Sequence, residues 1–508
     1  MYRFDCVTVF IFATTETDLL SETIRRIRSS CRDDDLSEII VVVPSADFPS
    51  YRHTQKLMEQ DPTGKLSIYL QKNGRFELFM TELPPLVKGS HFVFMAADLE
   101  MDPTNLQTFI QKAKLHPHRI IAASKWLPES TVTGYGKLRR ACSRTDCVRR
   151  SVQIRLPVRV NLSGTWTDAM PYCIDNGGDV IHAAVAVDGE LPVCVAAERL
   201  PEPVLVFEDE GASVRFTADE WKSAPQMTEI GRFNLHLAAV QLFGITSDTE
   251  ITGGLRLSTH VEGLAPGSGL GVSSILLGGC FLALNRLFDA KLSMDQILHM
   301  VFVAEQKMQT GGGWQDQVGG LTAGLKRTTS RPGFRQALSI QPLPLSSETT
   351  AWFDRNLCLL HTGKRHFGRF IVHDVMHRYL HGDAQTLSAL ETLKALNAQT
   401  ASCFLNGQTE DIAACLNRHF AALKQLSPRI TDDEICHLET LCAPICRAVS
   451  ICGAGGGGYL LACLREGKTA QDLRRHVRAH LPHLSDDCVK TISLWNESYL
   501  ISEEETAP

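Results

Sequence analysis

The stretch Pro266-Gly-Ser-Gly-Leu-Gly-Val-Ser-Ser274 leads directly into an apolar run that extends to residue 284. Alternate glycines let backbone N–H groups converge on an anion, and the unpaired N–H groups of a helix N-terminus add further donors. The stretch therefore predicts a phosphate-binding loop at the start of a helix, with serine hydroxyls able to reach a phosphate oxygen or a magnesium ion. A tight turn followed by helix-packing glycines has the same composition, so the stretch alone leaves both interpretations open.

Two common nucleotide-binding loops do not fit this stretch. No Gly-Lys-Ser or Gly-Lys-Thr closes it, as a Walker loop requires. It is also not a strand followed by Gly-x-Gly-x-x-Gly, a helix and a later acidic residue, which is the pattern of a dinucleotide site.

A segment with two candidate carboxylates follows the loop in sequence. Glu305 falls late in a helix that Ser293 would cap, and Thr310-Gly-Gly-Gly-Trp-Gln-Asp-Gln-Val-Gly-Gly320 presents Asp316 after a glycine turn. The two carboxylates supply one candidate metal ligand and one candidate base. Singly, Glu305 fits an exposed helical charge and Asp316 fits a turn residue, but their occurrence together with the predicted phosphate loop favours a functional role.

Two more segments, one on each side of the loop, carry candidate binding residues. Ile451-Cys-Gly-Ala-Gly-Gly-Gly-Gly-Tyr459 precedes an apolar strand, and four consecutive glycines weaken a purely structural strand, which favours close approach to a ligand. Pro157-Val-Arg-Val-Asn-Leu-Ser-Gly-Thr-Trp-Thr-Asp168 is a predicted strand that ends in a polar turn. Its Arg159 and Asp168 are candidates for the site, although a surface charge and an ordinary turn residue fit the same pattern.

In this order, the four segments resemble the GHMP small-molecule kinases, and within them the L-fucose kinases. The resemblance runs from about residue 152 to the end, and Thr362-Gly-Lys364 adds another matching stretch. It implies a two-lobed α+β kinase that phosphorylates the anomeric hydroxyl of L-fucose or a close relative, giving the sugar 1-phosphate and ADP. A heptose phosphate or another sugar stays open as the acceptor. The reason is that Gly164-Thr-Trp-Thr-Asp-Ala-Met-Pro171 departs from the Gly-Gly-Trp-Ser/Thr-Asp-Thr-Pro-Pro usual in fucose kinases.

The resemblance also implies roles for individual residues, with ATP and Mg2+ as cofactors. Asp316 would lie beside the attacking sugar hydroxyl, and Arg159 would hold it ionised or steady the transferring phosphoryl group. Ser273 and Glu305 would ligate Mg2+. The implied ATP-binding residues are Pro266, Gly267, Ser268, Gly269, Leu270, Gly271, Val272, Ser273 and Ser274. The implied sugar-binding residues are Trp166, Asp168, Gly312, Gly313, Gly455, Gly456 and Gly457. A catalytically silent protein that binds a nucleotide or sugar is the alternative from another functional class.

The first 150 residues have a different pattern. Short apolar strands are expected at residues 7–13, 38–43, 91–96 and 119–123, with amphipathic helices between them, which predicts an α/β domain with a parallel sheet. Phe94-Met-Ala-Ala-Asp-Leu-Glu-Met-Asp-Pro103 and Gly134-Tyr-Gly-Lys-Leu-Arg-Arg140 resemble family 2 glycosyltransferases of the GT-A type. That resemblance implies a truncated module, because the later acceptor-binding part of the family is absent, and an inactive one, because Ala96 replaces the first metal-binding carboxylate and only Asp98 is left. A working transferase on the same pathway is the alternative.

Length, composition and charge agree with a fusion of unequal parts. The chain has 508 residues, of which 44% are hydrophobic and 21% charged, as in globular proteins. The first 150 residues carry net charge +3 and the remainder −9, which marks a boundary near residue 150. We expect domains at 1–150, 151–345 and 346–508, with a solvated basic linker between residues 125 and 157. The overall charge of −6 argues against nucleic-acid binding.

The sequence also bears on compartment and cysteine chemistry. No run approaches the ~18 apolar residues of a membrane span, and the first residues lead into a strand pattern instead of a signal peptide, so we expect a cytoplasmic protein. The 16 cysteines are scattered, which predicts reduced structural thiols. Cys142 with Cys147 and Cys442 with Cys446 have no second pair at zinc-site spacing. Oligomeric state is not indicated.

Overall fold

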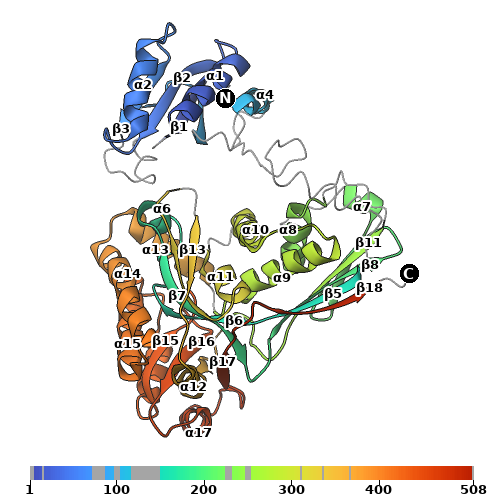
Figure 1. The fold of residues 1–508 in the computed structure, drawn as a ribbon, viewed down its shortest axis with the longest axis vertical. Coiled ribbons are helices and arrows are strands. Elements are labelled where there is room, and N and C mark those ends of the chain that lie inside the picture. Colours follow the sequence, from blue (N-terminus) through green and yellow to red (C-terminus); the bar gives the residue numbers. More distant parts are fainter. Residues whose placement is uncertain are drawn as a thin grey trace. The chain divides into compact units, whose positions relative to one another are not determined.

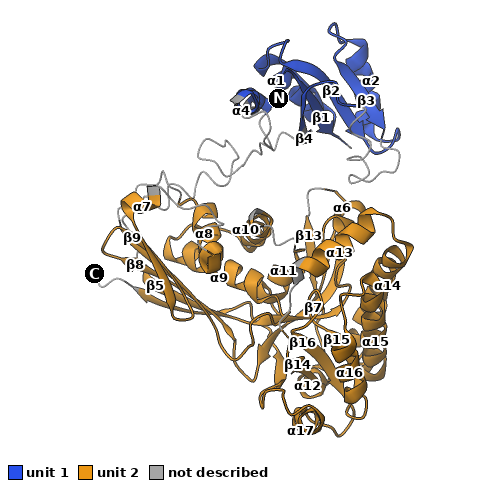
Figure 2. Cartoon of the chain, turned by 180° about the vertical axis from the view of Figure 1, so that it is seen from behind, with its two compact units in different colours: residues 1–136 blue, residues 137–508 orange. Residues whose placement is uncertain are grey.

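The structure is a computed structural model. It describes residues 5–13, 16–70, 86–96, 103–115, 149–222, 231–245, 253–308, 312–333, 337–364 and 368–505. The chain divides into two compact units, residues 1–136 and 137–508 (Figure 2).

Unit 1, residues 1–136, contains a four-stranded parallel sheet. The strand order is β3-β2-β1-β4, and each neighbouring pair is parallel. Nearly every residue of β2 is buried, as its β-branched run predicts for a strand covered on both faces. The strands are β1 (Val7–Phe12), β2 (Leu36–Val43), β3 (Leu66–Leu70) and β4 (His91–Ala96); the helices are α1 (Asp18–Ser30), α2 (Pro49–Glu59) and α4 (Leu106–Leu115).

The parallel α/β sheet of unit 1 is therefore confirmed, whereas its resemblance to glycosyltransferases stays a prediction. Asp98, the predicted strand at 119–123 and the motif at 134–140 lie outside the described residues. After β4, a short 3-10 turn over Pro103–Asn105 precedes α4, where the sequence predicts a helix between two strands.

Unit 2, residues 137–508, begins with a six-stranded sheet in the order β10-β9-β11-β8-β5-β18. Helix α9 lies on this sheet, with α8 and α10 packed beside it (Figure 1). The helix can approach the strands closely because residue 279 is a glycine. A Cβ at this position would lie 2.7 Å from the Val195 side chain. The strands are β5 (Arg149–Leu156), β8 (Val193–Leu200), β9 (Val204–Asp209), β10 (Ala212–Thr217), β11 (Gly254–Val261) and β18 (Leu500–Glu505). The helices are α7 (Ala218–Lys222), α8 (Asn234–Leu242), α9 (Val272–Leu287) and α10 (Met294–Lys307).

The expected linker is wrong over its last part, because residues 149–156 form strand β5. Val152, Ile154 and Leu156 are buried, and they alternate with polar residues at the period of two that a half-buried strand requires. The basic side chains concealed this alternation in the sequence. The earlier part of the linker lies outside the described residues.

A second, eight-stranded sheet in unit 2 has the order β13-β12-β7-β17-β14-β16-β15, with β6 paired to β7. Its strands are β6 (Val158–Ser163), β7 (Asp179–Val187), β12 (Leu325–Ser330), β13 (Leu338–Pro342), β14 (Leu357–His361), β15 (Cys446–Ile451), β16 (Tyr459–Leu464) and β17 (Val489–Leu494). The associated helices are α6 (Tyr172–Asn176), α11 (Gln315–Leu321), α12 (Ser347–Asn356), α13 (Gly368–Leu380), α14 (Ala384–Leu405), α15 (Thr409–Leu426), α16 (Asp433–Cys442) and α17 (Ala470–His480).

Strands from both sides of residue 345 share this sheet, and the last strand, β18, pairs with β5 of the other sheet. The last strand of the chain therefore lies in the same sheet as β5, the first strand of unit 2. The domain boundaries at residues 150 and 345 stay predictions. Among the described helices, none combines the length and apolarity needed to cross a membrane. Every described cysteine is a free thiol, in keeping with the sequence expectation.

Candidate functional site

The predicted phosphate loop is followed by a helix that starts where the sequence indicated. Gly271 is the N-cap of α9 and has a φ of +75°. Gly267 and Gly269 also have positive φ values, of +71° and +72°. These left-handed conformations explain the alternate glycines, because residues with a Cβ adopt them at a steric cost.

The glycine run after β15 packs against this loop, backbone to backbone. A Cβ on Gly269 would lie 2.7 Å from the Cys452 carbonyl oxygen, and one on Gly458 would lie 2.5 Å from the Ser268 carbonyl oxygen. The Tyr459 N–H donates to the same Ser268 carbonyl at 2.9 Å. Much of the close approach expected of this run is therefore to another loop of the chain.

A cavity of about 840 Å³ adjoins the two loops, and every residue that lines it belongs to unit 2. Gly453 and Ala454 line it, but the predicted sugar contacts Gly455, Gly456 and Gly457 do not. A Cβ on Gly455 would instead lie 2.8 Å from the Ile430 side chain. The loop residues that line the cavity are Pro266, Gly267, Ser268, Gly269, Gly271, Val272, Ser273 and Ser274, so Leu270 is the member of the predicted set that does not.

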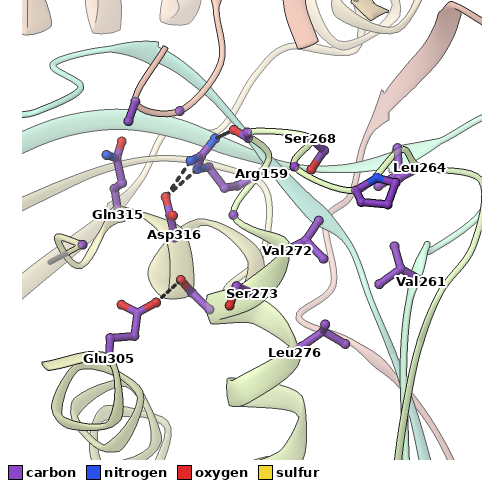
Figure 3. Close-up of a pocket in the computed structure, with 18 of the residues that line it drawn as sticks. Arg159, Val261, Leu264, Ser268, Val272, Ser273, Leu276, Glu305, Gln315 and Asp316 are labelled. Carbon is purple, nitrogen blue, oxygen red and sulfur yellow. Dashed lines mark hydrogen bonds and ion pairs between the residues drawn. The ribbon is translucent and has the colours of Figure 1, made fainter. Parts of the chain in front are cut away.

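Arg159 and Asp316 form an ion pair, in agreement with the resemblance, by which Arg159 would hold Asp316 ionised. The Arg159 guanidinium donates to Asp316 Oδ1 through Nε at 2.9 Å and Nη2 at 2.6 Å, and through Nη1 to the Gly269 carbonyl at 2.7 Å (Figure 3). The Arg159 side chain is 2% exposed and that of Asp316 is 30% exposed. The guanidinium thus joins the candidate base to the phosphate loop, and the partly exposed carboxylate lines the cavity.

Helix α11 carries Asp316 in its first turn. Side chains of three strands donate hydrogen bonds to this helix. Arg159 is on β6, and His182 on β7 is paired in register with Lys326 on β12. His182 Nδ1 lies 3.0 Å from the Gln315 carbonyl oxygen, which can only accept, so this nitrogen donates. Lys326 Nζ donates to the Gly319 carbonyl at 3.0 Å near the other end of the helix. Burial lowers the pKa of His182 well below its usual value, which agrees with a neutral ring.

Glu305 is buried, unlike the exposed helical charge that its sequence position alone would permit. It lies late in α10, whose N-terminus has the Ser293 cap expected from the sequence. Ser274 Oγ donates to Glu305 Oε1. Burial raises the pKa of Glu305 to about 8, although the hydrogen bond from Ser274 acts in the opposite direction. The serine in contact with Glu305 is therefore Ser274, whereas the predicted ligand Ser273 is exposed and lines the cavity.

Asp168 lies behind the cavity wall and does not line the cavity. Its side chain is fully buried, and its Oδ2 accepts a hydrogen bond from the Gln315 N–H at 2.9 Å. A Cβ on Gly313 would lie 2.1 Å from the same oxygen, so the Gly turn is packed directly on this carboxyl. Burial raises the pKa of Asp168 to about 7, and the nearby Asp316 carboxylate acts in the same direction. In this structure Asp168 supports the turn before α11, and Trp166, Gly312 and Gly313 line the cavity.

Several cavity residues were not identified from the sequence. Gln315 precedes Asp316, and its position next to the candidate base was the available signal. Val261, Leu264 and Leu276 form, with Val272, an apolar group at the opposite end of the view from Gln315 (Figure 3). They are ordinary apolar residues of a strand end, a loop and a helix, and no local pattern distinguishes them from core residues.

The donor set fits a magnesium ion and a nucleotide in chemical terms. Mg2+ prefers oxygen ligands and usually binds one or two carboxylates together with substrate phosphates and water. Glu305 and Ser273 line the cavity next to the phosphate loop and supply one carboxylate and one hydroxyl. Within the described residues no group of three His, Cys, Asp or Glu side chains could hold a metal alone, so phosphate oxygens would complete the set.

Comparison with known proteins agrees with this geometry. Residues 234–324 match the family model of the GHMP kinases N terminal domain. The chain therefore contains a GHMP kinases N terminal domain. The resemblance to GHMP kinases inferred from the sequence and the mixed α/β and α+β fold are thereby confirmed, while the likeness of unit 1 to glycosyltransferases is not addressed.

Two curated relatives each match about two thirds of this chain. The bifunctional fucokinase/GDP-fucose pyrophosphorylase of Arabidopsis thaliana is 28% identical over 332 residues, which are 65% of this chain and 31% of the relative. The L-fucokinase/L-fucose-1-P guanylyltransferase of Bacteroides fragilis is 24% identical over 342 residues, which are 65% of this chain and 36% of the relative. The chain thus spans about a third of the length of the curated relatives it matches.

A solved structure shows the same fold. The D-glycero-D-manno-heptose 1-phosphate kinase from Bacteroides thetaiotaomicron superposes with a TM-score of 0.54 at 14% identity, covering 70% of this chain and 100% of the other. At this level of identity the likeness concerns the fold of the GHMP kinase domain.

Proposed function

We propose that the GHMP kinase domain transfers a phosphoryl group from ATP to the anomeric hydroxyl of L-fucose or a close relative, giving the sugar 1-phosphate and ADP. The observation that carries the proposal is the Arg159–Asp316 pair, placed in one cavity with a glycine loop at a helix N-terminus. The names of the two curated relatives support fucose as the acceptor.

The nucleotide would bind along the glycine loop. The N–H groups at the start of α9 and the positive end of its dipole suit the negatively charged phosphates. The apolar side chains of Val261, Leu264, Val272 and Leu276 line the same cavity and would cover the faces of the adenine ring. This placement leaves Asp316 and Gln315 at the end where the acceptor would lie.

Asp316 would accept the proton of the attacking hydroxyl. Its carboxylate is partly exposed to the cavity and fixed in position by two Arg159 donors. Phosphoryl transfer passes through a loose transition state, so positioning and charge neutralisation contribute more than a strong base. Arg159 also places a positive charge between the base and the phosphate loop, where negative charge accumulates.

Mg2+ would be held by Glu305 and Ser273 together with ATP phosphate oxygens. When bound, it would neutralise charge on the phosphates. Ser274 would orient Glu305 through the hydrogen bond already present.

Release of ADP from Mg-ATP over a panel of sugars tests the proposed function. We expect turnover with L-fucose above the rate without sugar, and the panel should include L-galactose, D-galactose and a heptose phosphate. Folded protein that releases no ADP with any sugar would contradict a kinase function. Calorimetry that detected sugar binding in such a sample would favour the silent binding protein instead.

A further inference from the structure

The cavity has an apolar wall made by Trp166, Ala169 and Val372. All three line the cavity and belong to one buried cluster, with exposures of 4%, 9% and 8%. Trp166 and Ala169 come from the segment between β6 and α6, and Val372 comes from the second turn of α13. Apart from the indole N–H, these side chains carry no group that forms hydrogen bonds.

Hydrogen bonds place this wall at the acceptor end of the cavity. Thr165, which precedes Trp166, accepts from Asn161 Nδ2 at 2.7 Å, and the same amide donates to the Gln315 side chain. Gln315 is next to Asp316 in α11. The wall is therefore connected to the candidate base, whereas Val261 and Leu264 of the apolar group proposed for adenine lie on the side of the view away from Gln315 (Figure 3).

The indole nitrogen of Trp166 does not make the wall polar. Its Nε1 is buried and has no hydrogen-bond partner among the described residues. Trp166 also has a φ of +80°, an unusual backbone conformation for a bulky residue. Because the indole nitrogen has almost no accessible surface, it presents no donor to the cavity in this structure. The wall thus offers the cavity an aromatic side chain and two aliphatic side chains.

We propose that this wall binds the apolar C6 methyl group of a 6-deoxyhexose and makes the enzyme favour such sugars over their 6-hydroxylated counterparts. The inference rests on the proposed function and assigns specificity to Val372 and Ala169. A 6-hydroxyl placed against these side chains would lose its water without gaining a partner. Hydrophobic pockets of this kind discriminate by roughly 10- to 100-fold.

L-Fucose and L-galactose test the proposal directly, because they differ only in the hydroxyl on C6. We expect kcat/KM for L-fucose to exceed that for L-galactose by roughly 10- to 100-fold. Val372→Thr keeps the shape of the side chain and adds a hydroxyl, so it should narrow the ratio by about tenfold, mainly by improving L-galactose. Val375→Thr is the matched control, since Val375 lies one turn further along α13, is buried and does not line the cavity. The ratio of kcat/KM for L-fucose to that for L-galactose should be the same in Val375→Thr as in the wild type.

The outcomes separate the inference from the function on which it rests. Equal kcat/KM for both sugars, or an unchanged ratio in Val372→Thr, would overturn the assignment while the kinase function stood. Turnover of neither sugar would overturn both. If circular dichroism shows Val372→Thr to be unfolded, Ala169→Ser tests the same wall from the other segment, with the same expected narrowing and the same contradicting result.

Discussion

A single buried guanidinium connects the two functional parts of the site at the scale of residues. Arg159 is almost fully buried, yet three hydrogen bonds satisfy it, two to Asp316 and one to the Gly269 carbonyl. A buried charge without such partners would be strongly destabilising. Any change that moves the phosphate loop should therefore also move the base, since one side chain holds both.

Asp316→Asn should lower kcat by at least about 100-fold, because an amide cannot accept the proton of the sugar hydroxyl. ATP binding should stay within a few-fold of the wild type, since the phosphate loop is unchanged. Steady-state kinetics and calorimetry with ATP measure the two effects. Asp295→Asn is the control, because Asp295 is an exposed aspartate in the first turn of α10. A kcat for Asp316→Asn equal to that of the control would remove Asp316 from the proposed role.

The residue types of the site could be predicted from the sequence, but the contacts between these residues and the direction in which each side chain faces could not. Local signals worked where structure is local, as with the start of α9 after Gly271 and the Ser293 cap of α10. Asp168 and Asp316 both stand beside glycine turns in the sequence. Only the fold shows that Asp168 supports the turn from behind while Asp316 faces the cavity, because that difference depends on contacts about 150 residues apart.

At the scale of elements, the two glycine loops act as one unit. A Cβ on Gly269 would lie 2.7 Å from the Cys452 carbonyl oxygen, and a Cβ on Gly453 would lie 2.8 Å from the Gly269 carbonyl oxygen. The sequence identified both loops as close-approach segments, but composition cannot tell a ligand from another loop. Only the fold makes the distinction, since it places Gly453 and Gly458 against the backbone of Gly269 and Ser268.

Gly269→Ala and Gly467→Ala test this packing as a matched pair. Both glycines have a φ of +72°, so both variants pay a similar left-handed strain of roughly 1–2 kcal/mol. A Cβ on Gly269 would lie 2.7 Å from the Cys452 carbonyl oxygen, whereas Gly467 has no heavy atom within 4 Å. We expect Gly269→Ala to lose more unfolding free energy in urea and to bind ATP more weakly. Equal stability and ATP affinity in the two variants would contradict the packing.

At the scale of the whole molecule, strand order was the least predictable feature. Strands β17 and β18 return from the end of the chain to pair with β7 and β5, so each sheet of unit 2 combines distant segments. The strands themselves follow from their apolar alternation, but the choice of partner strands depends on packing across the whole unit.

Buried histidines are another feature of the packing in unit 2. Burial lowers the pKa of His236 to about 4 and that of His419 to about 3.

These histidines should make unit 2 sensitive to mild acid. Above pH 6.5 His419 is neutral in both the folded and the unfolded chain, so its contribution to stability is fully present there. Below pH 6.5 the unfolded chain binds a proton that the folded chain does not, and the free energy of unfolding falls. His419→Gln should therefore reduce the slope of unfolding free energy between pH 6 and 5 by up to about 1.4 kcal/mol per pH unit.

Urea unfolding at several pH values measures this slope. His437→Gln is the control, since His437 is an exposed histidine on α16. A slope for His419→Gln that matches both the control and the wild type would show that His419 does not titrate differently in the folded chain.

Identification of the product by phosphorus NMR tests the proposed activity most directly. Incubated with Mg-ATP and L-fucose, the protein should produce ADP and an equal amount of a sugar phosphate whose phosphorus couples to the anomeric proton. The same mixture with Asp316→Asn should show no such signal. A phosphate on any other position, or ATP left intact by folded protein, would contradict the assignment of this cavity as the site of anomeric phosphorylation.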